Sequence, residues 1–177
     1  MEVYLVRHAA ASERDPDRWP DDSERPLTPE GEKEFRRAAR GLARLVPRVD
    51  AILSSPYQRA WRTAEILSEL DSWPAPEPSP VLEPTLPPEK AVLALQEHAG
   101  AGAVAVVGHR PGLHEFASYL LTGRGDGLEI GLEKGGVACI RFDGAPAPNA
   151  GELRWLLTPE LLKSQAAVSA RAPLADT

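Results

Sequence analysis

Three short apolar runs, each ending in polar residues, constrain the fold of this 177-residue chain most strongly. They cover residues 3–6, 50–54 and 103–107. None shows the apolar–polar alternation that marks a strand with one face in water. A continuous apolar run of this length is typical of a strand buried on both faces, as in a parallel sheet covered by helices. We therefore expect parallel strands that alternate with helices along the chain.

Helical patterns introduced by capping residues follow these runs. Thr28 before Pro29 predicts a helix N-terminus, and apolar residues recur at helical spacing until Pro47. Ser55-Pro56 repeats this signature and predicts that the next helix begins there. The other expected helices cover 89–98 and 111–123, with a terminal helix from residue 159.

The remaining segments complete a single α/β domain. Residues 137–142 and 152–157 predict an antiparallel strand pair at the sheet edge. Seven prolines make regular structure improbable between residues 72 and 88, apart from a brief pairing at 81–82. We expect a three-layer α/β/α sandwich over residues 1–165, with a mainly parallel sheet and an antiparallel edge. Residues 166–177 are small and polar, and we expect them to be a frayed tail.

The composition excludes several classes of function. The net charge of −6 comes without a basic block, which argues against a nucleic-acid partner. No apolar run approaches the roughly 18 residues of a membrane span, so no membrane association is expected. Cys139 is the single cysteine, and it excludes an internal disulfide. A reducing compartment, the cytoplasm, is the expected location.

Chemically active residues stand where the apolar runs end. Arg7 and His8 follow the first run, Ser55 follows the second with Arg59 one helical turn on, and His109 follows the third. Ligands of open α/β sheets bind beyond the carboxyl ends of the strands, so these side chains should converge. Arginine matches the geometry of phosphate, and a neutral histidine is able to attack phosphorus. The sequence therefore predicts a phosphate site.

A metal site is the competing interpretation of paired histidines. Arginines would oppose a bound cation, and no carboxylate or third histidine stands at ligand spacing. We expect neither a metal nor another cofactor.

Four motifs carry a resemblance to a known family. They are Val6-Arg7-His8-Ala9, Leu27-Thr28-Pro29-Glu30-Gly31, the segment 54–64 (SSPYQRAWRTA) and Val107-Gly108-His109-Arg110-Pro111. Together they resemble the histidine phosphatase superfamily, also called phosphoglycerate-mutase-like. Residues 155–162 (WLLTPELL) look like the C-terminal segment of its small SixA branch, the phosphohistidine phosphatases. The resemblance runs from residue 3 to about 162 in the order of the family.

The resemblance implies a phosphatase that works without metal through a covalent phosphohistidine. His8 would be the nucleophile, and Arg7 and Arg59 would bind the transferred phosphate. His109 would hydrogen-bond the phosphoryl oxygens and stabilise the transition state. Mutases and sugar-phosphate phosphatases of the superfamily use a glutamate as general acid, and Glu83 is the candidate here, although its flanking residues do not fix the alignment. Ala9 is a second departure, because many members have glycine there.

The substrate remains open between several alternatives. Phosphoglycerate mutases carry a helical lid insertion, and residues 70–103 leave no room for one here. A lidless pocket favours a phosphate displayed on a protein, and a phosphohistidine tolerates a weak general acid because its imidazole leaving group is protonated in advance by solvent. The alternatives are a small metabolite phosphate, such as a sugar or nucleotide phosphate, and a non-catalytic phospho-binding module.

Other polar residues receive structural interpretations. Tyr57 flanks Arg59 and is a candidate for the pocket mouth. Arg62 is expected to form a surface ion pair, and His98 and His114 are expected on the surface.

Overall fold

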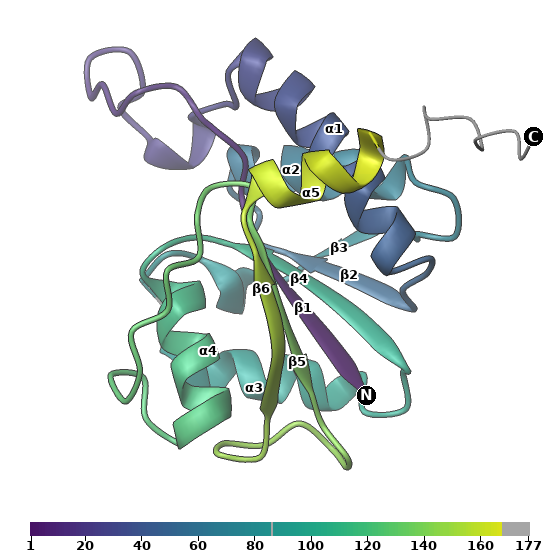
Figure 1. The fold of residues 1–177 in the computed structure, drawn as a ribbon. Coiled ribbons are helices and arrows are strands. Elements are labelled where there is room, and N and C mark those ends of the chain that lie inside the picture. Colours follow the sequence, from purple (N-terminus) through teal and green to yellow (C-terminus); the bar gives the residue numbers. More distant parts are fainter. Residues whose placement is uncertain (86, 168–177) are drawn as a thin grey trace, which may run out of the picture.

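A six-stranded sheet lies between two layers of helices in the computed structural model, which describes residues 1–85 and 87–167 (Figure 1). The strand order is β3-β2-β4-β1-β5-β6. The first four of these are mutually parallel, while β5 pairs antiparallel with both β1 and β6. The strands are β1 (Glu2–Arg7), β2 (Ala51–Ser54), β3 (Pro76–Pro78), β4 (Ala103–Gly108), β5 (Val137–Arg141) and β6 (Glu152–Leu157). The expected α/β/α sandwich with an antiparallel edge is confirmed.

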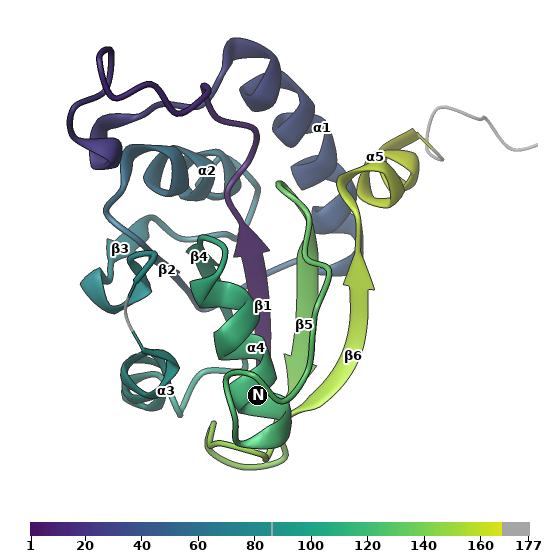
Figure 2. The ribbon, with the colours of Figure 1, turned by 90° about the vertical axis from the view of Figure 1, so that its left-hand side faces the viewer.

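Within the described residues, five α-helices cover the two faces of the sheet (Figures 1 and 2). One face carries α1 (Pro29–Leu45), α2 (Gln58–Ser68) and α5 (Pro159–Ala167). The other carries α3 (Pro88–Glu97) and α4 (Gly112–Thr122). None of the helices in the described part of the chain is long and apolar enough to cross a membrane.

The central strand β1 contributes to the core on both faces. Tyr4 and Val6 pack with α1 and α2, whereas Val3 and Leu5 pack with α3 and α4. All four side chains are nearly or fully buried. Burial on both faces explains why the apolar run shows no alternation, as the sequence pattern indicated.

The segment between α2 and α3 differs from the sequence expectation. The predicted pairing of Val81-Leu82 is wrong, because these residues lie in the 3₁₀-helix η2 (Pro80–Leu82). The strand is instead β3, which pairs Pro76 with Ile52 of β2. β3 is the edge strand of the sheet, where proline's missing N–H breaks no internal ladder, and this position accommodates two prolines in one short strand.

Two helix boundaries also differ. The helix expected from Pro56 begins at Gln58 instead, with Tyr57 as its N-cap residue and without a side-chain cap. Ser55 does not cap this helix in the expected way, because its hydroxyl faces a histidine, as described below. At the other end, α5 includes residues 166 and 167, which were expected to be frayed; residues 168–177 lie outside the described part.

The connection between β1 and α1 leaves the sheet and returns beside α2 (Figure 2). It carries the short 3₁₀-helix η1 (Asp22–Glu24), which contacts α2. Residues 9–28 bring a carboxylate back to the carboxyl ends of the strands.

Candidate active site

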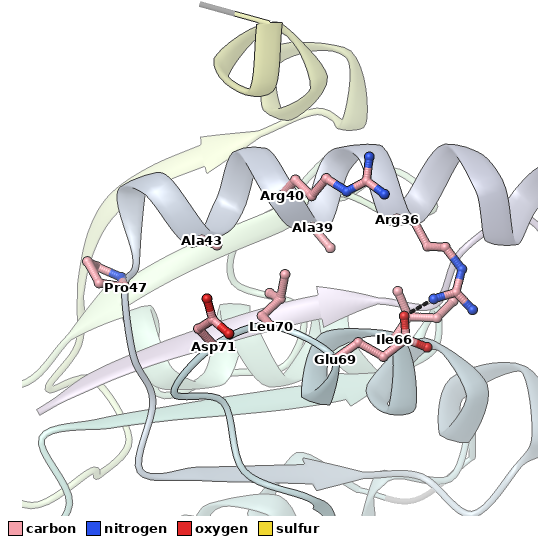
Figure 3. A pocket seen from close by; sticks show the side chains of 9 residues that line it. All are labelled: Arg36, Ala39, Arg40, Ala43, Pro47, Ile66, Glu69, Leu70 and Asp71. Atoms are coloured by element: carbon pink, nitrogen blue, oxygen red, sulfur yellow. Dashed lines mark hydrogen bonds and ion pairs between the residues drawn. The ribbon is translucent and has the colours of Figure 1, made fainter. Parts of the chain in front are cut away.

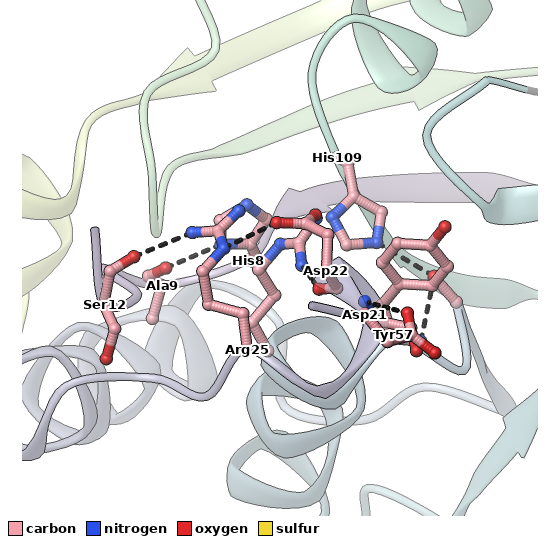
Figure 4. A network of polar contacts seen from close by, with 11 residues as sticks. His8, Ala9, Ser12, Asp21, Asp22, Arg25, Tyr57 and His109 are labelled. Carbon is pink, nitrogen blue, oxygen red and sulfur yellow. Dashed lines mark hydrogen bonds and ion pairs between the residues drawn. The ribbon is translucent and has the colours of Figure 1, made fainter. Parts of the chain in front are cut away.

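The carboxyl ends of three neighbouring strands bring the predicted residues together. The strand register aligns Arg7 with Gly108, and Ser54 with Val107. The residues that follow are therefore neighbours across the sheet edge. The rings of His8 and His109 lie 5.1 Å apart, and both residues are more than nine-tenths buried (Figure 4).

His8 is held with one ring nitrogen free. Its Nδ1 lies 2.7 Å from the carbonyl oxygen of Ala9, and since a carbonyl only accepts, Nδ1 carries the proton. Nε2 then keeps its lone pair. Burial lowers the pKa of His8 to about 3, with Arg59 and Arg7 adding to the effect and the Ala9 carbonyl opposing it. The imidazole is therefore neutral at physiological pH, the state that a nucleophile needs.

His109 is oriented by Ser55. Its Nε2 lies 2.9 Å from Ser55 Oγ, which also accepts a hydrogen bond from the Tyr57 backbone N–H. Among the described residues, the Ser55 hydroxyl proton has no acceptor other than Nε2, so the hydroxyl donates to Nε2 and the ring proton lies on Nδ1. Burial lowers the pKa of His109 to about 2, and His8 and Arg59 add to the shift. Nδ1 is buried and has no partner among the described residues.

Two arginines face the histidines from different elements. Arg7 ends β1 and donates from Nη1 to the carbonyl oxygen of Leu132 at 3.0 Å. Arg59 lies in the first turn of α2, and Thr63 ties that helix to the end of β1 by donating to the Arg59 carbonyl and accepting from the Ala9 N–H. Burial lowers the pKa of both arginines, which nevertheless remain charged at any working pH.

Three buried side-chain nitrogens of the site have no hydrogen-bond partner in the described part of the chain. In the described part of the chain, the buried side-chain nitrogens or oxygens without a partner are Arg7 Nε, Arg59 Nε and His109 Nδ1. Unpaired buried N–H groups are costly and rare in folded proteins. All three belong to residues at this sheet edge, and two of them carry positive charge. An oxyanion, which has several acceptor oxygens, would satisfy them together.

The other predicted residues have different surroundings. Tyr57 lies at the site, with its ring 5.3 Å from that of His109 and edge-on to it. Arg62 forms ion pairs with Glu32 and Glu65, as expected. The surface assignment of His114 is wrong, because it is half-buried and its Nε2 contacts the Leu132 carbonyl oxygen, which also accepts from Arg7.

Glu83, the predicted general acid, is not brought into this network. It follows η2 and its backbone packs near Gly112. No hydrogen bond or ion pair joins its side chain to any described residue. Its catalytic role stays a prediction.

Two residues of the site had no signal in the sequence. Asp22 and Arg25 stand in the polar connection after β1, where acidic and basic residues are ordinary solvent-facing groups. Asp22 binds Arg59 by an ion pair of 2.9 Å, and Arg25 binds Asp22 at 2.8 Å. Only the folded path of the connection shows that they reach the site (Figure 4).

Comparisons with known proteins identify the family of the chain. The sequence model of the histidine phosphatase superfamily (branch 1) matches residues 3–79. An uncharacterized protein of Picosynechococcus sp. is 34% identical over 166 residues, which cover 92% of this chain and 99% of that protein. The structure of the protein histidine phosphatase SixA complexed with tungstate superposes with a TM-score of 0.78 at 26% identity, covering 90% of this chain and 97% of that one. The chain belongs to the histidine phosphatase superfamily.

Within this superfamily the chain is a phosphatase of the SixA-like branch. The alpha-ribazole phosphatase of Shigella flexneri shares the fold, with a TM-score of 0.69 at 15% identity over 90% of this chain and 97% of that one. Phosphatases of the SixA-like branch act on phosphorylated substrates.

A separate groove lies between α1 and α2 (Figure 3). Alanine and leucine side chains form its floor, and the ion pair between Arg36 and Glu69 crosses it at one end. Arg7, His8, Arg59 and His109 do not line this groove.

Proposed function

We propose that this histidine phosphatase removes phosphate from a phosphohistidine carried by a protein, through a covalent phosphohistidine on His8. The supporting observation is the pairing of a neutral His8, whose Nε2 lone pair is free, with three buried unpartnered N–H donors. A nucleophile and an anion cradle are the two parts that phosphoryl transfer needs.

The first step transfers the phosphoryl group to the enzyme. Arg7, Arg59 and His109 bind the phosphoryl oxygens, and their N–H groups oppose the charge of the transition state. His8 Nε2 attacks phosphorus as the P–N bond of the substrate breaks. The leaving imidazole departs neutral because solvent has protonated it beforehand.

The second step returns the enzyme to its starting state. Water attacks the phosphorus of phospho-His8, the P–Nε2 bond breaks, and its electron pair stays on Nε2. The water proton passes to the released phosphate or to solvent. Orthophosphate leaves, and His8 is again neutral with Nδ1 hydrogen-bonded to Ala9.

Two features support an N-linked phosphate. The connection between α2 and β4 holds only β3, η2 and α3, so the described residues contain no lid inserted there to enclose a small metabolite. No hydrogen bond or ion pair joins the Glu83 side chain to Arg7, His8, Arg59 or His109 in the described structure, and an alkyl phosphate depends more on a general acid than a phosphohistidine does.

The test is a comparison of kcat/KM on a histidine-phosphorylated protein with values on a panel of sugar and nucleotide phosphates. The proposal predicts the highest value on the phosphoprotein, and no turnover by His8→Ala on any substrate. Higher kcat/KM on a metabolite phosphate would contradict the assignment of the substrate. Turnover by the His8 variant would contradict the mechanism.

A further inference from the structure

One edge of the Arg59 guanidinium is already occupied by the chain itself. Arg59 Nη2 lies 2.9 Å from Asp22 Oδ2, and Nη1 donates to the Asp22 backbone carbonyl at 2.7 Å. The Arg59 side chain is 4% exposed and that of Asp22 is 34% exposed. A planar guanidinium held at both terminal nitrogens has a fixed orientation.

The two hydrogen bonds to Asp22 leave the Nε–H group of the Arg59 guanidinium for a ligand. Arg59 Nε is buried without a partner, as are Arg7 Nε and His109 Nδ1. The Arg59 guanidinium also lies 5.1 Å from the centre of the Tyr57 ring. Asp22 on one edge and Tyr57 on the face therefore restrict Arg59 to presenting its Nε edge.

Asp22 is itself held in place. Arg25 Nε donates to Asp22 Oδ1 at 2.8 Å, and Arg25 Nη1 donates to the Ser12 carbonyl at 2.8 Å (Figure 4). Ser12 and Asp22 both lie in the connection between β1 and α1, Ser12 near its start and Asp22 in η1. Arg25 therefore fastens the fold of this connection and the carboxylate that it presents.

We propose that Asp22 is a positioning residue for phosphate binding, acting through Arg59 and held by Arg25. This rests on the proposed function, since it assumes that Arg59 binds the substrate phosphate. Two effects of Asp22 oppose each other. Its charge repels an incoming phosphate, whereas its hydrogen bonds orient the arginine that binds it. Orientation dominates, because a free arginine would have to lose its side-chain freedom on every binding event.

The experiment measures the affinity for inorganic orthophosphate by calorimetry. Asp22→Asn keeps the shape of the side chain but loses its charge. We expect it to weaken orthophosphate binding about tenfold, the size typical of a lost charge-assisted hydrogen bond. Glu24→Gln is the matched control, because it removes the same charge from η1 at an exposed residue. Its affinity should stay within about twofold of wild type.

A double-mutant cycle shows whether Asp22 acts through Arg59. If it does, adding Asp22→Asn to Arg59→Ala changes affinity by less than about twofold. A purely structural effect of Asp22 would weaken both backgrounds equally and would overturn the inference. Asp22→Ala, with melting temperatures for all variants, serves as the second test if the amide variant folds poorly.

Tighter or unchanged orthophosphate binding by Asp22→Asn would also overturn it, because the carboxylate would then be a competitor of phosphate or irrelevant to it. Failure of wild-type protein to bind orthophosphate at all would instead count against the proposed function. The two failures are therefore distinguishable.

Discussion

Single atoms decide the chemistry at this site. The Ala9 carbonyl fixes the proton of His8 on Nδ1, and Ser55 Oγ contacts Nε2 of His109. The partner of each histidine lies within two residues of a strand end. The two rings consequently present opposite functions toward the space between them, a lone pair on His8 and an N–H on His109.

Replacing Ser55 with alanine removes the hydroxyl that orients His109. His109 Nε2 would lose its partner at 2.9 Å, and the ring proton would no longer be confined to Nδ1. We expect kcat/KM to fall about tenfold, because a misplaced proton removes one donor from the phosphoryl oxygens.

Ser68→Ala is the matched control for this measurement. Ser68 is the last residue of α2, at the opposite end of this helix from Ser55, and its hydroxyl donates to the Glu65 carbonyl. Its kcat/KM should match wild type. Equal losses of kcat/KM in both variants would show that Ser55 acts through the packing of α2 and not through the orientation of His109.

At the scale of helices and strands, the pattern of apolar and polar residues predicted most of the fold. The buried runs became β1, β2 and β4 because strands covered on both faces need no polar alternation. The prolines at 76–78 concealed β3, since proline counts against a strand unless the strand is known to lie at an edge. Sequence spacing does not show which strand will be the edge.

The convergence of Arg7, His8, Arg59 and His109 was predictable because strand ends of a parallel sheet meet at one edge. The involvement of Asp22 was not. It stands 14 residues beyond His8 in a polar loop, and its place depends on long-range contacts of η1 with α2. Local sequence does not encode such a contact.

The approach of α1 to the end of the first connection gives a prediction at this scale. A Cβ at Gly31 would lie 2.1 Å from the Ala10 carbonyl oxygen and 2.9 Å from Thr28 Oγ1. Backbone would have to move, so Gly31→Ala should lower the free energy of unfolding by about 2 kcal/mol or more in urea denaturation. At Gly100 a Cβ meets nothing within 4 Å, and Gly100→Ala should cost less than about 0.5 kcal/mol. Similar losses at both positions would contradict the packing of α1 described above.

For the whole molecule, the two buried histidines couple folding to pH. Burial is the main cause that lowers the pKa of His8 to about 3 and that of His109 to about 2 in the folded protein. In an unfolded chain both histidines keep the ordinary pKa of 6.5, so the unfolded chain binds protons more readily below that pH. The contribution of the two neutral histidines to the free energy of unfolding is therefore fully present above pH 6.5, and it is lost as the pH falls toward their pKa values in the folded protein. Each of the two histidines should lower the free energy of unfolding by about 2 kcal/mol when the pH falls from 7.5 to 5.

Urea denaturation at the two pH values checks this, in buffer without phosphate. His109→Asn removes one of the two groups and should reduce the pH-dependent loss by about 2 kcal/mol. His114, whose pKa is also lowered by burial, adds a smaller loss in both proteins. An unchanged pH dependence in His109→Asn would show that His109 is not held neutral by the fold.

The most direct test of the central claim is to trap the phosphoenzyme. Brief exposure to a histidine-phosphorylated protein, followed by denaturation at alkaline pH, should yield a chain one phosphoryl group heavier. Peptide mapping by mass spectrometry should place the group on His8, and acid should remove it. His8→Ala should stay unlabelled. Labelling of the variant, or turnover by wild-type protein without any phosphoryl group on His8, would contradict a covalent mechanism at this residue.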